Sequence, residues 1–238
     1  MNTQEQAPTL LMDFEQARAT HTEKMRQYNS ICADIDRCEK ERQAAIEAGK
    51  EAESNWRTRF RTLRGNLTDE LRAEHAQRIA SRELADEFNG LLEELEIDKE
   101  AAMLSCCTSG EKYVASHRSV FTEFADVHWQ SAVRNVSPSL LWAIKLRLQR
   151  EYISRSFVGE DRNPVKDVAE LVGKVLIDAA IALPDNALEE APVLENIGIR
   201  RPALTGVDMM LYNSPIKRSQ RFTALEEKRK AIEKGAQQ

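Results

Sequence analysis

The stretch LMDFEQARATHTEKMRQYNSICADIDRCEKERQAAIEA, residues 11–48, places apolar and semi-apolar side chains three or four positions apart. Charged residues occupy most of the positions between them. About five heptads of this pattern predict a helix over residues 10–52, with one side buried in a coiled-coil seam. The predicted seam comprises Leu10, Phe14, Ala17, His21, Met25, Tyr28, Ile31, Ile35, Cys38 and Ala45.

A second long helix is expected to begin at Thr68, since threonine is a good N-cap and Asp69 and Glu70 suit the positive end of a helix dipole. Gly110 interrupts its pattern, so either one helix of about 60 residues runs through it or two helices meet there. An antiparallel hairpin would bury this stripe against the first. The predicted stripe is Leu71, Ile79, Leu84, Phe88, Leu91, Leu95, Ala102, Leu104, Tyr113, Val120, Phe124 and Val127.

Shorter helices follow. Ser137-Pro138 and Asn163-Pro164 are typical helix starts, with a cap followed by proline in the first turn. The first of these helices is expected to bury Leu140, Leu141, Ile144 and Leu148. The second, residues 164–183, is the most apolar segment and is expected to form the core of a C-terminal bundle. Prolines make residues 184–214 irregular, and Ser214-Pro215 begins a final helix.

The predicted fold class is therefore all-α, an elongated long helical hairpin (antiparallel coiled coil) with a smaller C-terminal helical bundle. A composition with 31% charged and 6% aromatic residues is typical of long helices. The expected divisions are a flexible N-terminus at 1–9, the hairpin at 10–135 and a C-terminal helical region at 136–238.

Composition also narrows the function classes. A net charge of −5 makes nucleic acid an unexpected partner. No apolar run is long enough to span a membrane, and the N-terminus lacks the pattern of a signal peptide, so we expect a protein of the cytoplasm. The cysteines, Cys32, Cys38, Cys106 and Cys107, are expected to be free thiols, because their spacing does not suit zinc.

No catalytic motif was found. The histidines are scattered through the helical region, no glycine-rich phosphate loop follows a strand, and most carboxylates fit solvated helix faces. We therefore expect a protein that is not an enzyme and that takes no cofactor, metal or small-molecule substrate.

One segment stands out, NWRTRFRTLRGN at residues 55–66, which we term the basic-aromatic cluster. Arginine and aromatic residues dominate the energetic centres of interfaces, which favours protein docking. The same residues could equally form a hairpin connection, with the aromatics capping the core and the arginines in water. Phosphate contact with base stacking ranks behind both. The basic-aromatic cluster comprises Trp56, Arg57, Arg59, Phe60, Arg61 and Arg64.

A second basic face is formed by Lys145, Arg147 and Arg150. It is either a solvated helix face or a second docking surface.

The region from residue 56 to residue 91 resembles the capsid size determination proteins (Sid) of satellite bacteriophages. The matching elements are Trp56-Arg57-Thr58, Phe60-Arg61, Gly65, Asp69-Glu70-Leu71, His75 and Arg82-Glu83-Leu84. Weaker similarity covers the upstream coil, residues 105–121 and residues 192–218. The C-terminal stretch is also similar to the polarity suppression proteins (Psu), which decorate the shell and antagonise the termination factor Rho. The arginine-aromatic motif favours the first family.

The resemblance implies an external scaffold that binds the helper phage major capsid protein and redirects assembly to a smaller icosahedral shell. It implies a homo-oligomeric cage on the outside of the procapsid, in the host cytoplasm, that is absent from the mature virion. On this reading the basic-aromatic cluster and the second basic face dock on the capsid protein. Self-association is expected at Leu211, Tyr212, Arg218, Phe222 and Leu225. The alternatives are a Psu-like decoration protein or Rho antagonist and, third, a nucleic-acid-binding coiled coil.

Overall fold

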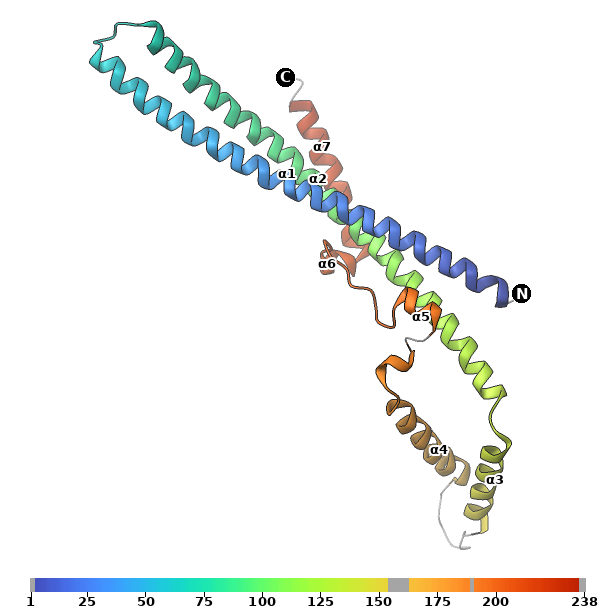
Figure 1. Ribbon diagram of the computed structural model, residues 1–238. Coiled ribbons are helices and arrows are strands. Elements are labelled where there is room, and N and C mark those ends of the chain that lie inside the picture. Colours follow the sequence, from blue (N-terminus) through green and yellow to red (C-terminus); the bar gives the residue numbers. More distant parts are fainter. Residues whose placement is uncertain (1–2, 154–162, 189–190, 236–238) are drawn as a thin grey trace. The chain divides into compact units, whose positions relative to one another are not determined.

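A computed structural model describes residues 3–153, 163–188 and 191–235. Two long antiparallel helices, α1 (Thr3–Thr62) and α2 (Asp69–Arg134), form a hairpin, and shorter helices follow (Figure 1). The described residues contain no strand, and the predicted all-α class is confirmed. α1 begins at Thr3, earlier than the expected start at residue 10.

The seam predicted for α1 is confirmed. Phe14, His21, Ile35, Cys38 and Ala45 are all buried, and the other predicted members from residue 17 to residue 31 are half-buried or buried. In the middle of the hairpin Ile35 and Cys38 form a cluster with Leu92, flanked by Ile31, Phe88 and Leu95.

The predicted stripe on α2 is wrong by one position over part of its length. Leu84 and Leu91 are 50% and 42% exposed, whereas their neighbours Ala85 and Leu92 are buried. The buried residues Leu71, Ala85 and Leu92 are separated by multiples of seven, which is the spacing of a coiled-coil seam. Small side chains occupy part of this seam, and a Cβ added to Gly49 of α1 would lie in ordinary contact, 3.5 Å from the Cβ of Ser81. A search for periodic large apolar residues cannot detect such a seam.

α2 runs through Gly110 as one helix, so the single-helix alternative is confirmed. A Cβ at Gly110 would lie 3.2 Å from Cε1 of His21 and 3.3 Å from Cδ2 of Leu204. Glycine therefore lets α1 and a segment of the tail press against α2 at this point, and the interruption in the sequence pattern reflects packing.

The hairpin connection begins later than the sequence pattern indicates. α1 continues through the basic-aromatic cluster to Thr62. The amide of Gly65 then donates to the carbonyl of Phe60 (3.0 Å) and that of Arg64 to Arg61 (3.1 Å), the pattern of a Schellman motif. Thr68 caps α2 as predicted, because its Oγ1 accepts from the amide of Leu71 (3.3 Å).

The shorter helices begin where predicted. Ser137 and Asn163 accept from backbone amides at the starts of α3 (Pro138–Ile153) and α4 (Pro164–Ile181). Ser214 does so for the final helix α7 (Pro215–Gly235). Between α4 and α7 lie a 3₁₀ turn (Asp185–Leu188), α5 (Pro192–Ile197) and α6 (Met209–Tyr212). The stretch GEDRN at residues 159–163, whose composition predicts a turn, lies largely outside the described residues. No described helix is both long and apolar enough to cross a bilayer.

The expectation that α3 and α4 form a buried core is wrong for the chain on its own. The two helices pack together, but α3 has no buried residue and α4 buries only Pro164 and Val168. Leu141 is 56% exposed, while Ile144 and Leu148 are only half-buried. Two short helices cannot enclose an apolar core between them, so most of their apolar surface stays in solvent.

The chain divides into two compact units. One unit combines residues 1–14 and 114–202, and in it His117 stacks against Phe121 and donates from Nε2 to the carbonyl of Gly198 (3.1 Å). The other combines residues 15–113 and 203–238. The three-part division expected from the sequence stays a prediction.

We expect Gly110→Leu to lower the free energy of unfolding by about 1–3 kcal/mol, since the larger side chain must displace His21 or Leu204. Gly90→Leu is the matched control, because nothing lies within 4 Å of the position that its Cβ would occupy. Urea unfolding followed by circular dichroism measures both. Equal effects of the two substitutions would show that the contact at Gly110 does not constrain the fold.

Candidate docking site

The aromatic residues of the basic-aromatic cluster lie at the tip of the hairpin and join its two helices. Trp56 stacks on Phe60 (5.1 Å between ring centroids) and lies 5.5 Å from His75 of α2. The guanidinium of Arg78, also on α2, lies 4.8 Å from the Trp56 ring centroid. Since Trp56 and Phe60 are half-buried, they hold the ends of α1 and α2 together, as the hairpin-connection interpretation of the cluster expects.

Two of the four arginines in the cluster are engaged within the hairpin. Arg59 reaches across to Glu70 (2.7 Å) and Glu74 on the first turns of α2. Hydrogen bonds to Glu74 and Glu70 raise the pKa of Arg59. Arg57 pairs with Glu53 one turn earlier on α1 (2.5 Å). These pairs are exposed, so each adds little to stability, but together they orient the tip.

Arg61 and Arg64 present exposed guanidinium groups beside these pairs, and within the described chain neither forms an ion pair. Arg64 has a φ of 49°, the left-handed conformation that a Schellman motif usually assigns to glycine. It is the only described residue other than glycine with positive φ. Its arginine side chain is therefore held at a position that disfavours any side chain, next to the freely projecting Arg61.

The second basic face lies on α3, in the other compact unit. Lys145 and Arg150 are exposed, whereas Arg147 is half-buried and pairs with Glu151 (3.3 Å). Lys145 and Arg150 are therefore open to solvent, whereas Arg147 forms an ion pair within α3.

The residues expected to mediate self-association lie mostly inside one protomer. Tyr212, Arg218 and Leu225 are buried, Leu211 is half-buried, and Phe222 is 38% exposed. Arg218 donates to the carbonyls of Leu211 (3.3 Å) and Tyr212 (2.6 Å) and pairs with Glu111 of α2. Their self-association role stays a prediction. The observed contacts of Arg218 join the tail to the hairpin of its own chain.

Sequence reasoning missed this attachment of the tail. α7 runs antiparallel to α2 and is joined to it by three ion pairs, Arg218–Glu111, Arg221–Glu100 and Arg229–Asp98. The available signal was the acidic run EELEIDKE at residues 93–100, opposite a final helix rich in arginine and lysine. Charge complementarity between segments more than 100 residues apart does not show by itself that the two segments pack together.

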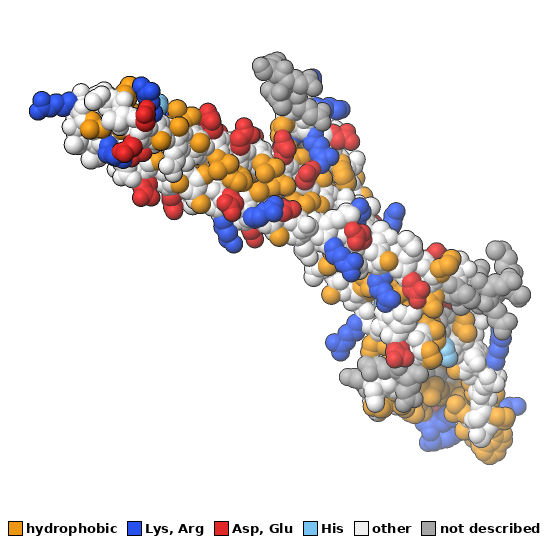
Figure 2. Space-filling model, turned by 45° about the horizontal axis from the view of Figure 1, so that its top comes forward, with side chains coloured by type: hydrophobic (Ala, Val, Ile, Leu, Met, Phe, Trp, Pro, Cys, Tyr) orange, Lys and Arg blue, Asp and Glu red, His pale blue; other side chains and the backbone are white. Residues whose placement is uncertain are grey.

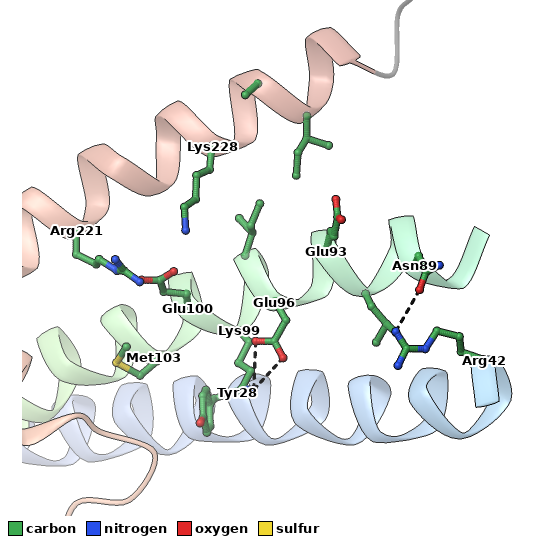
Figure 3. Close-up of a pocket in the computed structure, with 14 residues that line it drawn as sticks. Tyr28, Arg42, Asn89, Glu93, Glu96, Lys99, Glu100, Met103, Arg221 and Lys228 are labelled. Atoms are coloured by element: carbon green, nitrogen blue, oxygen red, sulfur yellow. Dashed lines mark hydrogen bonds and ion pairs between the residues drawn. The ribbon is translucent and has the colours of Figure 1, made fainter. Parts of the chain in front are cut away.

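A groove of about 1000 Å³ lies between α7 and the hairpin (Figure 3). Leu92, Ile97 and Ile232 contribute apolar surface, and Glu93 and Lys228 project from opposite walls. The Glu100–Arg221 pair lies at one end of the labelled set, and Arg42, which donates to Asn89 (3.1 Å), lies at the other. In the space-filling view a band of hydrophobic side chains follows the hairpin beside α7 (Figure 2).

Residues 203–208, which precede α6, form a strap across the hairpin. Leu204 contacts the Gly110 position, and Thr205 lies 3.4 Å from the sulfur of Met25. At Gly206 a Cβ would lie 3.1 Å from the Tyr28 ring, and φ is +67°, so only glycine fits there. The irregular structure predicted for residues 184–214 is confirmed for this segment.

Beneath the strap lies a buried polar pair. His21 is 2% exposed, and its Nδ1 lies 3.0 Å from Oγ of Ser109, which itself donates to the carbonyl of Cys106 (3.2 Å). Because the Ser109 proton is used, Nδ1 of His21 must be the donor, which leaves Nε2 unprotonated. Nε2 is buried without a partner in the described chain. Burial lowers the pKa of His21, so the imidazole is neutral.

The cysteines support packing. Cys38, Cys106 and Cys107 are buried free thiols, and Cys32 is half-buried. Burial raises the pKa of Cys106 to about 11, so its reactive thiolate is scarce at neutral pH. Across the described residues no group of three or more His, Cys, Asp or Glu side chains is placed to hold a metal ion.

These features define an all-helical protein built on a long antiparallel hairpin. The chain is 28% identical over 211 residues to Glycoprotein 3 of Enterobacteria phage P4, covering 87% of this chain and 86% of that protein. A chain of the solved satellite phage P4 procapsid including size determination (Sid) protein has the same fold. The TM-score is 0.81 at 24% identity, over 96% of this chain and 98% of that one. No protein-family model matches. The similarity to size determination proteins predicted from residues 56–91 is therefore confirmed.

Acid is expected to weaken the packing at His21. The folded state disfavours protonation of His21, whereas the unfolded state takes up a proton near the ordinary pKa of about 6.5. The contribution of neutral His21 is therefore fully present above that pH and is lost as the pH falls below it. Thermal unfolding measured along a pH series should show a smaller acid-induced drop in Tm for His21→Gln than for the wild type. Parallel curves for the two proteins would contradict this assignment.

Proposed function

We propose that this protein is an external scaffold that binds the outside of a phage procapsid and directs the capsid protein into a smaller shell. The observation that carries the proposal is near full-length similarity, in sequence and in fold, to a protein found in the satellite phage P4 procapsid. That procapsid includes a size determination (Sid) protein, and size determination is the activity that we transfer to this chain.

The hairpin tip is the proposed docking site for the major capsid protein of a helper phage. Its aromatic stack and the Arg59 pairs join the ends of α1 and α2, and Arg61 and Arg64 are exposed beside these contacts. Left-handed φ at a residue other than glycine is more often found where function requires the side chain. Lys145 and Arg150 on α3 provide a second, separate basic contact.

Docking at each tip need not be strong. Several copies joined into a cage would bind a shell through many tips at once, and avidity would compensate for weak single contacts. Such a protein acts by binding, in the cytoplasm of the host and on the outer surface of the procapsid, and leaves before the virion matures. It needs no cofactor and performs no chemistry on its partner.

Shell diameter tests the proposal. The protein is expressed together with the capsid and internal scaffold proteins of a candidate helper phage, and particles are imaged by negative-stain electron microscopy. Mostly small shells with an outer lattice are expected. Normal-sized shells that carry the protein would contradict size determination and favour decoration. A transcription readthrough assay with Rho would then test the Psu-like alternative.

The double charge reversal Arg61→Glu with Arg64→Glu should shift particles from small to normal size, because two exposed arginines suit an acidic surface of the capsid protein and two glutamates would be repelled by it. The matched control is Arg26→Glu with Lys40→Glu, two exposed positions on α1 outside the tip. Circular dichroism would be used to check that both variants fold. If the Arg61→Glu, Arg64→Glu variant produced small shells in the same proportion as the control variant and the wild type, docking at the tip would be excluded.

Arg64→Gly separates function from stability. Glycine adopts the left-handed conformation without strain, so we expect the free energy of unfolding to stay equal or to rise by up to about 1 kcal/mol. The proportion of small shells should nevertheless fall, because a guanidinium is lost from the tip. A variant that is at least as stable as the wild type and fully active in shell sizing would show that Arg64 has no docking role.

A further inference from the structure

The tail helix α7 is firmly attached over its first half and loosely attached over its second. Arg218 and Leu225 are only 7% and 4% exposed, and Arg218 donates to two backbone carbonyls besides its ion pair with α2. Beyond Leu225 the contacts are weaker. Ile232 is only half-buried, and the side chains of Arg229 and its partner Asp98 are each 50% exposed. The second half of α7 is therefore the part of this helix that can move most easily.

The groove between α7 and the hairpin lies beside this second half. Leu92 of α2 and Ile232 of α7 contribute apolar surface to it. Glu93 and Lys228 project from its opposite walls (Figure 3). Within the described part of the chain neither of these charged side chains forms an ion pair. An anion and a cation thus face the same groove without making contact.

Lys228 and Glu93 are the next step of an ion-pair ladder that has already begun. Arg221 of α7 pairs with Glu100 of α2. Because the two helices are antiparallel, seven residues further along α7 and seven residues back along α2 lead to Lys228 and Glu93. Seven residues are two helical turns, so both side chains lie on the same helix faces as the pair that is formed. The sequence repeats the charge pair, but the structure leaves the second pair open.

The ion pair between Arg229 and Asp98 accounts for this gap. Glu93 and Asp98 are five residues apart, which places them about 140° apart round α2. Arg229 therefore draws α7 towards one flank of α2, whereas Lys228 would draw it towards the other flank, where the groove lies. The contact of Arg229 is the one that is made, and the groove is open.

We propose that the second half of α7 is a lid with two positions and that Asp98 determines which of them it occupies. In the observed position Arg229 pairs with Asp98, and the groove is open. In the other position α7 leans into the groove, Lys228 pairs with Glu93, and Ile232 covers the apolar floor. The first half of α7, fixed by Arg218 and Leu225, stays in place in both positions.

The two positions are close in free energy. Each has one exposed ion pair at the end of α7, and exposed pairs contribute little because water and salt screen them. The closed position gains burial of apolar surface, and the open position keeps more conformational freedom at the end of the helix. A change at one charged residue is therefore enough to move the lid.

The lid controls access to the groove within a single chain. It needs neither capsid protein nor a second copy, so it does not depend on the proposed function. Asp98 lies on the exposed flank of α2, outside the groove. A cationic group of a partner that engaged Asp98 there would release Arg229 and close the groove from the other side of the helix.

The distance between two spin labels tests the lid. The labels are attached to Asn89→Cys on α2 and Ala231→Cys on α7, both of which line the groove. Cys32→Ser is included in all variants, since the other cysteines are buried. Asp98→Asn should shorten the mean distance by about 5 Å, half the diameter of a helix, as α7 leans into the groove. Asp126→Asn, at an exposed carboxylate elsewhere on α2, is the matched control and should leave the distance unchanged.

Removal of the second anion distinguishes closure from loosening. Adding Glu93→Gln to Asp98→Asn should restore the distance of the labelled parent, because the inward ion pair can no longer form. Circular dichroism checks that the helix content is kept. A distance that stays the same or lengthens in the Asp98→Asn variant would show that the pair with Arg229 is a simple tether, and it would overturn the proposal. Shortening that persists in full after Glu93→Gln would also overturn it.

Discussion

The rest of the structure depends on how closely α2 approaches its neighbours. Where Gly49 meets Ser81 and where Gly110 meets His21, the absence of bulk lets backbones come together. At the second place the approach also admits Leu204, so the tail strap can lie on the hairpin. A larger residue at Gly110 would displace His21 or lift the strap, and α7 would then lose the position from which its arginines reach α2.

The tail helix α7 and the α3–α4 hairpin differ in the kind of surface that they present. α7 is joined to the hairpin largely by charge, through Arg218, Arg221 and Arg229, with Leu225 as its one buried large apolar side chain. The α3–α4 hairpin instead presents aliphatic surface and little internal burial. Salt screens the ion pairs of α7 but not apolar contacts, so ionic strength acts mainly on the attachment of the tail to the hairpin.

The sequence predicted most of the helices because capping and periodicity are local properties. Ser137, Asn163 and Ser214 mark real helix starts, and the α1 seam follows its apolar repeat. The sequence-based predictions were wrong where contacts between segments distant in the sequence determine which side chains are buried. Ala85, and not Leu84, lies in the seam with α1, and most of the apolar surface of α4 stays exposed because α3 covers only part of it. At the tip, the residue types indicated a special segment, but only the structure separates Trp56, which joins the helices, from Arg61, which projects freely.

The His21–Ser109 pair determines how far the hairpin tip lies from this point of the hairpin. A polar contact inside an apolar seam allows one alignment of the two helices, because a slip of one turn would leave both groups buried and unpartnered. The hairpin beyond the pair therefore has a fixed length. At 1.5 Å per residue the 41 residues from His21 to Thr62 span about 60 Å. The pair thus sets the register from which the distance to the hairpin tip follows. Removing one heptad from each helix would bring the hairpin tip about 10 Å nearer to the His21–Ser109 pair without changing the seam.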